Sequence, residues 1–181
     1  MWLEKSLFTI LVSLILYLII FIHLKKNKYS LQSIFGITLL YFYGIIVFHV
    51  TILPLPLDKL GVESLQMMAT NRNYINLIPI IDFIEYDKYS FIKQVIGNIF
   101  MFMPLGILFP LVFKKCNNIK ILIKYSFFIS LFIEILQLVI CLFLIKAPFR
   151  VFDINDLILN TFGAILGYIL YFSIKVIIDK R

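Results

Sequence analysis

The stretch that decides the fold runs from Ile119 to Ile145 and reads IKILIKYSFFISLFIEILQLVICLFLI. It is longer than the roughly 20 apolar residues with which a helix crosses the hydrocarbon core of a membrane. Its charged residues are Lys120 and Lys124 near its start and Glu134 in its middle. The stretch therefore predicts a transmembrane helix that carries one acidic side chain at mid-depth.

The rest of the chain repeats this pattern. Hydrophobic residues make up 62% and charged residues 15% of the sequence, against roughly 45–50% and 25% in soluble domains. We expect an all-α membrane protein with about five transmembrane helices, in which residues 1–181 form a single integral membrane domain. The other four predicted spans run from Leu7 to Leu24, from Leu31 to Leu53, from Gln94 to Phe113 and from Ile154 to Ile178.

Basic residues concentrate in connections that five spans would place on one side of the membrane. The positive-inside rule makes that side the cytoplasm, so we expect the N-terminus outside and the C-terminus inside. The formal net charge of +7 then reflects membrane orientation, and we expect no nucleic-acid partner. The residues concerned are Lys25, Lys26, Lys28, Lys114, Lys115, Lys120, Lys175, Lys180 and Arg181.

The connection between the second and third predicted spans carries a shorter apolar stretch, from Ile75 to Ile84. Asn76, Pro79 and Asp82 interrupt it, and it is too short to span a bilayer. We expect this external loop to carry an interfacial or re-entrant segment.

Polar residues within the fourth span share one face of the predicted helix. An ionisable group at mid-membrane costs roughly 2.5–3.5 kcal/mol on insertion scales, so such groups usually face protein or water. A mid-span carboxylate such as Glu134 therefore favours a functional or site-organising role. Helical spacing places on one stripe Ser126, Ser130, Glu134, Gln137 and Cys141.

The third and fifth spans begin with polar residues at the same predicted external level. Gln94 and Asn98 lie one turn apart, and the fifth span starts with Asp153, Asp156 and Asn160. Arg150, in the preceding loop, is placed to neutralise Asp153, Asp156 or Glu134, because a guanidinium can bridge carboxylates. We expect these side chains to form one external polar cluster.

Structural interpretations remain open for several of these residues. Asp153 is equally typical of a helix N-cap, and amides such as Asn98, Gln137 and Asn160 often hydrogen-bond between membrane helices. Gly163 and Gly167 favour close helix packing. The two cysteines show no metal-ligand spacing, and we expect neither a metal nor a cofactor.

Several short sequence strings between about residue 74 and residue 168 occur in the order and spacing of a known family. They are Asn76-Leu77-Ile78-Pro79, Gly97-Asn98, Phe102-Met103-Pro104-Leu105-Gly106, Pro110-Leu111, Ser130 with Glu134 and Gln137, Arg150, Asp153, Asp156-Leu157, Asn160-Thr161, Gly163 and Gly167. From about residue 74 to 168 the chain thereby resembles the VanZ-like family of bacterial membrane proteins. It departs from the family pattern at Ile80, where an aromatic residue is usual, and at Phe149, where glycine is usual.

The resemblance implies a multi-pass protein of the bacterial cytoplasmic membrane that contributes to tolerance of teicoplanin and other lipophilic cell-envelope antibiotics. Our leading hypothesis is a non-enzymatic protein that binds a lipid or amphiphile. The partners would be membrane lipids, a lipid-linked cell-wall intermediate or a lipoglycopeptide. The expected ligand-binding residues are Asn76, Asn98, Glu134, Gln137, Arg150, Asp153, Asp156 and Asn160.

Two other functions remain open from the sequence. In the first, an intramembrane enzyme uses Glu134 or Asp156 as general acid or base on a lipid head group or a lipid-linked cell-wall intermediate. In the second, the chain is a transporter or flippase. The mid-span Glu134 favours this function, whereas the lack of a visible internal repeat gives it little support.

Overall fold

The computed structural model describes residues 2–3, 7–56, 58–69, 73–79 and 88–179. Within these residues, five helices are long and apolar enough to cross a membrane, which confirms the predicted number. Their bounds lie within a few residues of those expected from the sequence. They are α1 (Leu7–Lys26), α2 (Leu31–Thr51), the π-helix η1 (Ile92–Ile96) continued by α6 (Gly97–Val112), α7 (Ile119–Val139) continued by the π-helix η3 (Ile140–Ile145), and α8 (Ile154–Asp179).

Polar side chains fix where several helices begin. The Ser30 hydroxyl accepts a hydrogen bond of 3.2 Å from the backbone N–H of Ser33 at the start of α2. Asn118 follows the 3-10 helix η2 (Lys114–Asn117), and its side chain accepts from the N–H of Lys120 at the start of α7. These caps satisfy N–H groups that have no partner within the helix.

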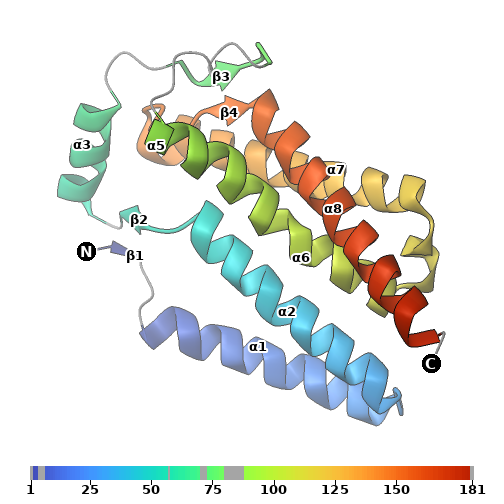
Figure 1. The fold of residues 1–181 in the computed structure, drawn as a ribbon. Coiled ribbons are helices and arrows are strands. Elements are labelled where there is room, and N and C mark those ends of the chain that lie inside the picture. The colour runs from blue at the N-terminus through green and yellow to red at the C-terminus, as the bar shows by residue number, and fades with distance from the viewer. Residues whose placement is uncertain (1, 4–6, 57, 70–72, 80–87, 180–181) are drawn as a thin grey trace.

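Helix α6 is the centre of the bundle (Figure 1). It packs along α8, and it also contacts α2 and α7. Helix α1 lies at the periphery against α2, where the Tyr17 and Thr38 hydroxyls are 3.0 Å apart and the Tyr41 hydroxyl donates to the Ser13 carbonyl. The outward faces of the long helices expose large apolar side chains, as expected of surfaces in contact with lipid.

Glycines set the distance between α6 and α8. A Cβ atom added at Gly163 would meet the backbone of Ile99, and one added at Gly167 would meet the backbone of Met103. Gly106 on α6 meets the backbone of Ala164 in the same way. The packing interpretation of Gly163 and Gly167 is thus confirmed, because small residues let membrane helices approach to backbone contact.

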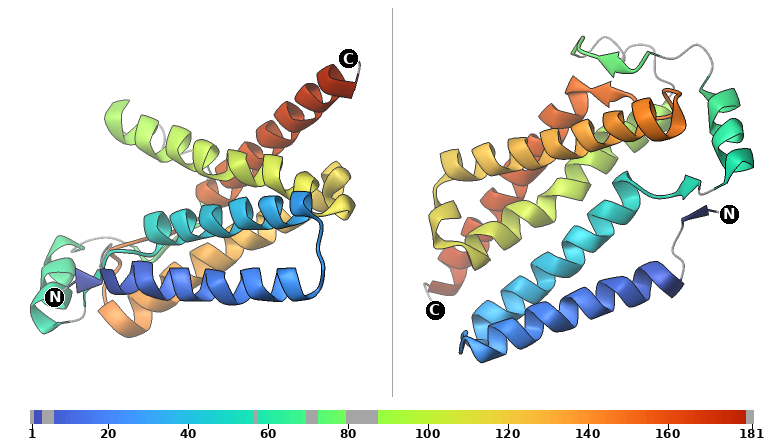
Figure 2. Two further views of the ribbon diagram at one scale, coloured as in Figure 1. Left: turned by 90° about the horizontal axis from the view of Figure 1, so that it is seen from below. Right: turned by 180° about the vertical axis from the view of Figure 1, so that it is seen from behind.

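The two ends of the bundle differ in composition. The lysine-bearing connections between α1 and α2 and between α6 and α7 lie at the same end as the C-terminus of α8 (Figure 2). The other end carries α3 (Lys59–Met68), which the sequence did not predict, and which is tied to η3 by the Gln66 side-chain amide donating to the Ile145 carbonyl at 2.7 Å. The assignment of the lysine-rich end to the cytoplasm stays a prediction.

Short strands link the connections at this second end. The strand β1 (Trp2–Leu3) pairs antiparallel with β2 (Leu55–Pro56). The strand β3 (Ile75–Asn76) pairs in parallel with β4 (Phe152–Asp153), just before α8.

The predicted interfacial or re-entrant segment is only partly described. Residues 75–79 form strand β3 and a turn, whereas residues 80–84 lie outside the described residues. The re-entrant segment therefore stays a prediction. A short helix, α5 (Lys88–Phe91), leads from this region into η1.

We expect Gly167→Val to lower the free energy of unfolding by about 1–3 kcal/mol, the usual cost of overpacking. The reason is that the new Cβ meets the Met103 backbone. Thermal unfolding of the purified protein in detergent measures this change. The matched control is Gly44→Val on α2, where an added Cβ has no heavy atom within 4 Å. Equal stability of the two variants would contradict the proposed close packing.

Candidate functional site: a polar cavity at one end of the bundle

A cavity of about 320 Å³ is lined by residues from the end of α2, from η1 and the start of α6, and from the start of α8. It brings together six of the eight residues that the sequence predicted as a ligand site: Asn98, Glu134, Gln137, Arg150, Asp156 and Asn160. These residues come from α6, α7, α8 and the connection before α8. The other lining residues are Val50, Thr51, Lys93, Gln94, Gly97, Met101 and Ile133.

Glu134 reaches the cavity from the polar stripe of α7. The five residues predicted to share this stripe are all buried, and Glu134 is only 2% exposed. Its carboxylate oxygen Oε2 accepts a hydrogen bond of 3.1 Å from the backbone N–H of Asp153. The stripe therefore faces protein rather than lipid, and the acid is held against the start of α8.

Asp156 is anchored from the facing helix. Its Oδ1 oxygen accepts a hydrogen bond of 2.5 Å from the side-chain amide of Gln94 and one of 2.6 Å from that of Asn98. Gln94 lies on the π-helix η1, whose wider turn changes the direction of the side chains before α6 begins. Two amide donors on one oxygen hold this carboxylate at the cavity wall.

Arg150 is fixed mainly by backbone groups. Its Nη2 donates to the Leu53 carbonyl at 3.3 Å, and its own carbonyl accepts a bond from the Cys141 thiol at the same distance. The guanidinium carbon lies 5.7 Å from the ring centre of Phe149. Burial lowers the pKa of the Arg150 guanidinium from its usual value, yet an arginine remains charged at neutral pH.

The sequence placed Arg150 to neutralise Asp153, Asp156 or Glu134, and the structure supports this only for Glu134 and without direct contact. Arg150 lines the same cavity as Glu134 and Asp156 but forms no direct ion pair with an acidic side chain among the described residues. The charge of Glu134 still acts on the guanidinium and opposes the lowering of the Arg150 pKa by burial. The direct hydrogen-bond acceptor of the guanidinium is instead the carbonyl of Leu53, which lies just beyond the end of α2.

Two amide side chains tie the helices around the cavity. The Gln137 amide donates to the Thr51 carbonyl at 2.8 Å, linking α7 to the end of α2. The Asn160 amide donates to the Ser130 hydroxyl at 2.9 Å, linking α8 to α7. This is the interhelical role left open by the sequence.

Two buried polar atoms of the lining residues lack a partner within the described part of the chain. They are Nε of Arg150, a donor, and Oδ1 of Asn160, an acceptor. Asn160 is only 2% exposed. Buried polar groups normally have partners, so a ligand or bound water that reaches these two atoms would displace no protein hydrogen bond.

The remaining predicted site residues, Asp153 and Asn76, do not line the cavity. Asp153 is the N-cap of α8, and its Oδ1 accepts from the N–H of Asn155 at 2.8 Å. Asn76 stands opposite Asp153 in the β3–β4 pair, and its side-chain oxygen accepts from the N–H of Ile78. Both residues support the connection that carries Arg150.

The predicted set lacked three polar lining residues: Thr51, Lys93 and Gln94. Gln94 stood out in the sequence one turn before Asn98, but Thr51 and Lys93 gave no signal, because each lies at a span end where polar residues are common. Among the described residues, no group of three His, Cys, Asp or Glu side chains could hold a metal ion. The cavity instead offers two cations, two carboxylates and amides for hydrogen bonding.

The family model VanZ/LLP1 matches residues 40–177 of the chain. The chain belongs to the VanZ/LLP1 family. It is also similar to Protein VanZ of Enterococcus faecium, with 32% identity over 127 residues that cover 69% of this chain and 69% of that protein. No solved structure matches.

The range matched to VanZ/LLP1 contains every residue that lines the cavity and includes the expected core of residues 74–168. It begins within α2 and leaves out the peripheral helix α1. The elements shared with the VanZ/LLP1 family are therefore those that build the cavity.

We expect Asn98→Ala and Asp156→Ala to be strongly non-additive in thermal unfolding, because each removes the same hydrogen bond. Residues in one hydrogen-bond network typically couple by about 0.5–3 kcal/mol. The control cycle combines Asp156→Ala with Thr38→Ala at the α1–α2 contact, where we expect additive effects. Additivity in both cycles would contradict the anchoring of Asp156 by α6.

Proposed function

We propose that this VanZ/LLP1 protein binds the polar head of a membrane amphiphile in the cavity and thereby contributes to tolerance of glycopeptide or other lipophilic cell-envelope antibiotics. The observation that carries the proposal is the polar cavity, which brings Lys93, Arg150 and Asn160 together on one lining. Arg150 Nε and Asn160 Oδ1 add hydrogen-bonding capacity that no described residue uses. Family membership supports the antibiotic part, since it suggests a function of the teicoplanin-resistance type.

The cavity combines groups that suit a head with both acidic and hydroxyl or amide functions. Lys93 and Arg150 can bind a phosphate or carboxylate, and arginine does so with two parallel hydrogen bonds where geometry allows. The Asn160 oxygen can accept from a hydroxyl or amide of the same head. Such heads occur in membrane lipids, in lipid-linked cell-wall intermediates and in lipoglycopeptides.

The site is proposed to face the outside of the bacterial cytoplasmic membrane. The opposite end of the bundle carries the lysine-rich connections, and positively charged connections are typically cytoplasmic. Lipid-linked cell-wall intermediates and lipoglycopeptides would reach the cavity from the external side of the bilayer.

The first test is antibiotic tolerance in a sensitive bacterial host. We expect Arg150→Ala and Glu134→Gln to abolish the teicoplanin tolerance given by the wild-type chain, while both variants accumulate in the membrane at the wild-type level. The control is Lys59→Ala, which removes an exposed cation from α3 outside the cavity lining. Full tolerance with both cavity variants, or none with the wild-type chain, would refute the proposal.

Cysteine labelling tests the orientation. In a chain with Cys116→Ser and Cys141→Ser, we expect Lys59→Cys at the cavity end to react with a membrane-impermeant maleimide in intact cells. Lys120→Cys, exposed at the opposite end, should react only after the cells are permeabilised. The reverse pattern would place the cavity on the cytoplasmic side.

A further inference from the structure

An apolar groove of about 310 Å³ runs along the bundle next to the polar cavity. Phe102, Leu105 and Phe109 of α6 form its floor, and all three are buried. Its other lining residues come from α2 and α7, and both of these helices contact α6. On α2 the groove reaches from Leu40 to Ile52, a length of about 18 Å at 1.5 Å per residue.

The polar atoms of the groove are already satisfied. The Tyr43 hydroxyl donates to the Met101 carbonyl at 2.9 Å, and the Thr51 hydroxyl donates to the Val47 carbonyl at 2.8 Å. The remaining lining side chains are aliphatic or aromatic. A surface of this kind suits hydrocarbon rather than water, because it offers water no free hydrogen-bonding partner.

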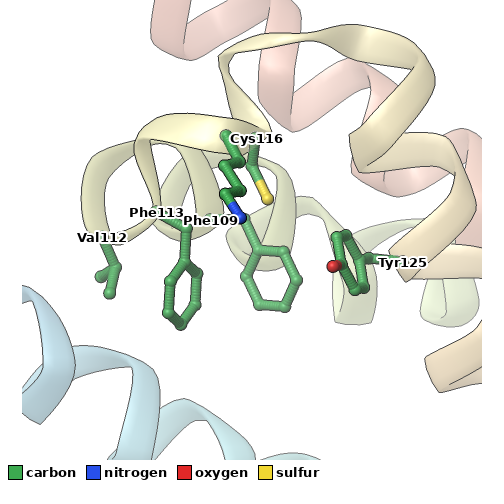
Figure 3. Close-up of a pocket in the computed structure, with 6 residues that line it drawn as sticks. Phe109, Val112, Phe113, Cys116 and Tyr125 are labelled. Carbon is green, nitrogen blue, oxygen red and sulfur yellow. The ribbon is translucent and has the colours of Figure 1, made fainter.

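The groove is continuous with its neighbours at both ends. Thr51 and Ile133 line both the groove and the polar cavity. At the other end, Phe109 is shared with a third cavity of about 590 Å³, which approaches the lysine-rich end. Figure 3 shows the rings of Phe113, Phe109 and Tyr125 in a row along this third cavity.

Gly44 shows that the groove is open space rather than a close helix contact. Glycine in a membrane helix usually permits a neighbouring backbone to approach, as Gly163 and Gly167 do here. A Cβ added at Gly44, which lines the groove, would have no heavy atom within 4 Å. At this position the missing side chain leaves room beside α2.

We propose that the groove holds a long hydrocarbon chain of the same amphiphile whose head occupies the polar cavity. The ligand class is a lipid with a compact, anion-bearing head and one chain, acyl or isoprenoid, that enters sideways from the bilayer between α2 and α7. This inference rests on the proposed function. The groove alone is longer than half of a hydrocarbon core about 30 Å thick, so it suits a chain that reaches past the middle of the membrane.

The test is photo-crosslinking of the purified full-length protein in bilayer nanodiscs. The probes are an alkyl phosphate and a polyprenyl phosphate, each with a diazirine at mid-chain, and the crosslinked peptides are identified by mass spectrometry. We expect crosslinks to concentrate on the groove segments of α2 and α7 rather than on the exposed face of α1. The probe with the higher yield distinguishes an acyl from an isoprenoid chain.

Three variants test whether occupancy of the groove depends on both the chain site and the head site. Gly44→Leu fills the groove, and Gly97→Leu fills the polar cavity, where an added Cβ also meets no neighbouring atom. We expect each to lower groove crosslinking by about tenfold, a change that corresponds to ~1.4 kcal/mol. The control, Ile46→Phe, adds volume to α2 at an exposed position outside the groove lining and should leave the yield unchanged.

The outcomes distinguish this inference from the proposed function. If Gly44→Leu lowers groove crosslinking but Gly97→Leu and Arg150→Ala do not, the groove holds ordinary bilayer lipid and the inference is wrong. If crosslinks spread evenly over α1, α2 and α7, it is also wrong. A probe with its diazirine beside the phosphate tests the head site separately, through its crosslinks to α6 and the Arg150 connection.

Discussion

Backbone contact between α6 and α8 is the constraint on which the other features depend. Gly106, Gly163 and Gly167 leave no space for a side chain between the two helices, so their relative register is fixed. That register places the amides of Gln94, on η1, and Asn98, in the first turn of α6, at hydrogen-bonding distance from Asp156 in the first turn of α8. A larger separation would leave the half-buried Asp156 carboxylate without these donors, which is costly in a membrane protein.

Hydrogen bonds to Asp153 likewise fix the junction of α7 with α8. Asp153 caps α8 through its side chain, while its own backbone N–H is bound by Glu134. The start of α8 and the position of the Glu134 carboxylate therefore depend on the same residue, Asp153. The parallel pairing of β3 with β4 also ties this junction to the connection between α3 and α5, and it brings Asn76 opposite Asp153. Residues outside the cavity lining thus determine where the lining residues stand.

The sequence predicted the five spans and the buried polar stripe of α7, because both follow from length, hydropathy and helical period. It also predicted six of the cavity residues as one cluster. It did not predict Thr51 or Lys93 in the lining, since their places depend on how α2 and η1 lie against α7 and α8. The Arg150 contact was missed for a similar reason: the acceptor is the Leu53 carbonyl, and backbone groups carry no sequence signal.

Gly163 and Gly167 lie against the backbone of a neighbouring helix, whereas Gly44 faces open space. This contrast bears on the proposed selection of a ligand. In water, an open apolar groove between α2 and α7 would tend to close, because burial of apolar surface is favourable. In a bilayer, lipid tails are as apolar as the helix surfaces, so this driving force is absent and the groove can persist beside Gly44. For the proposed ligand, hydrocarbon contact then adds little discrimination between lipids. The selectivity that we propose therefore rests on the polar cavity, where Arg150 and Asn160 carry hydrogen-bonding atoms that lipid tails cannot satisfy.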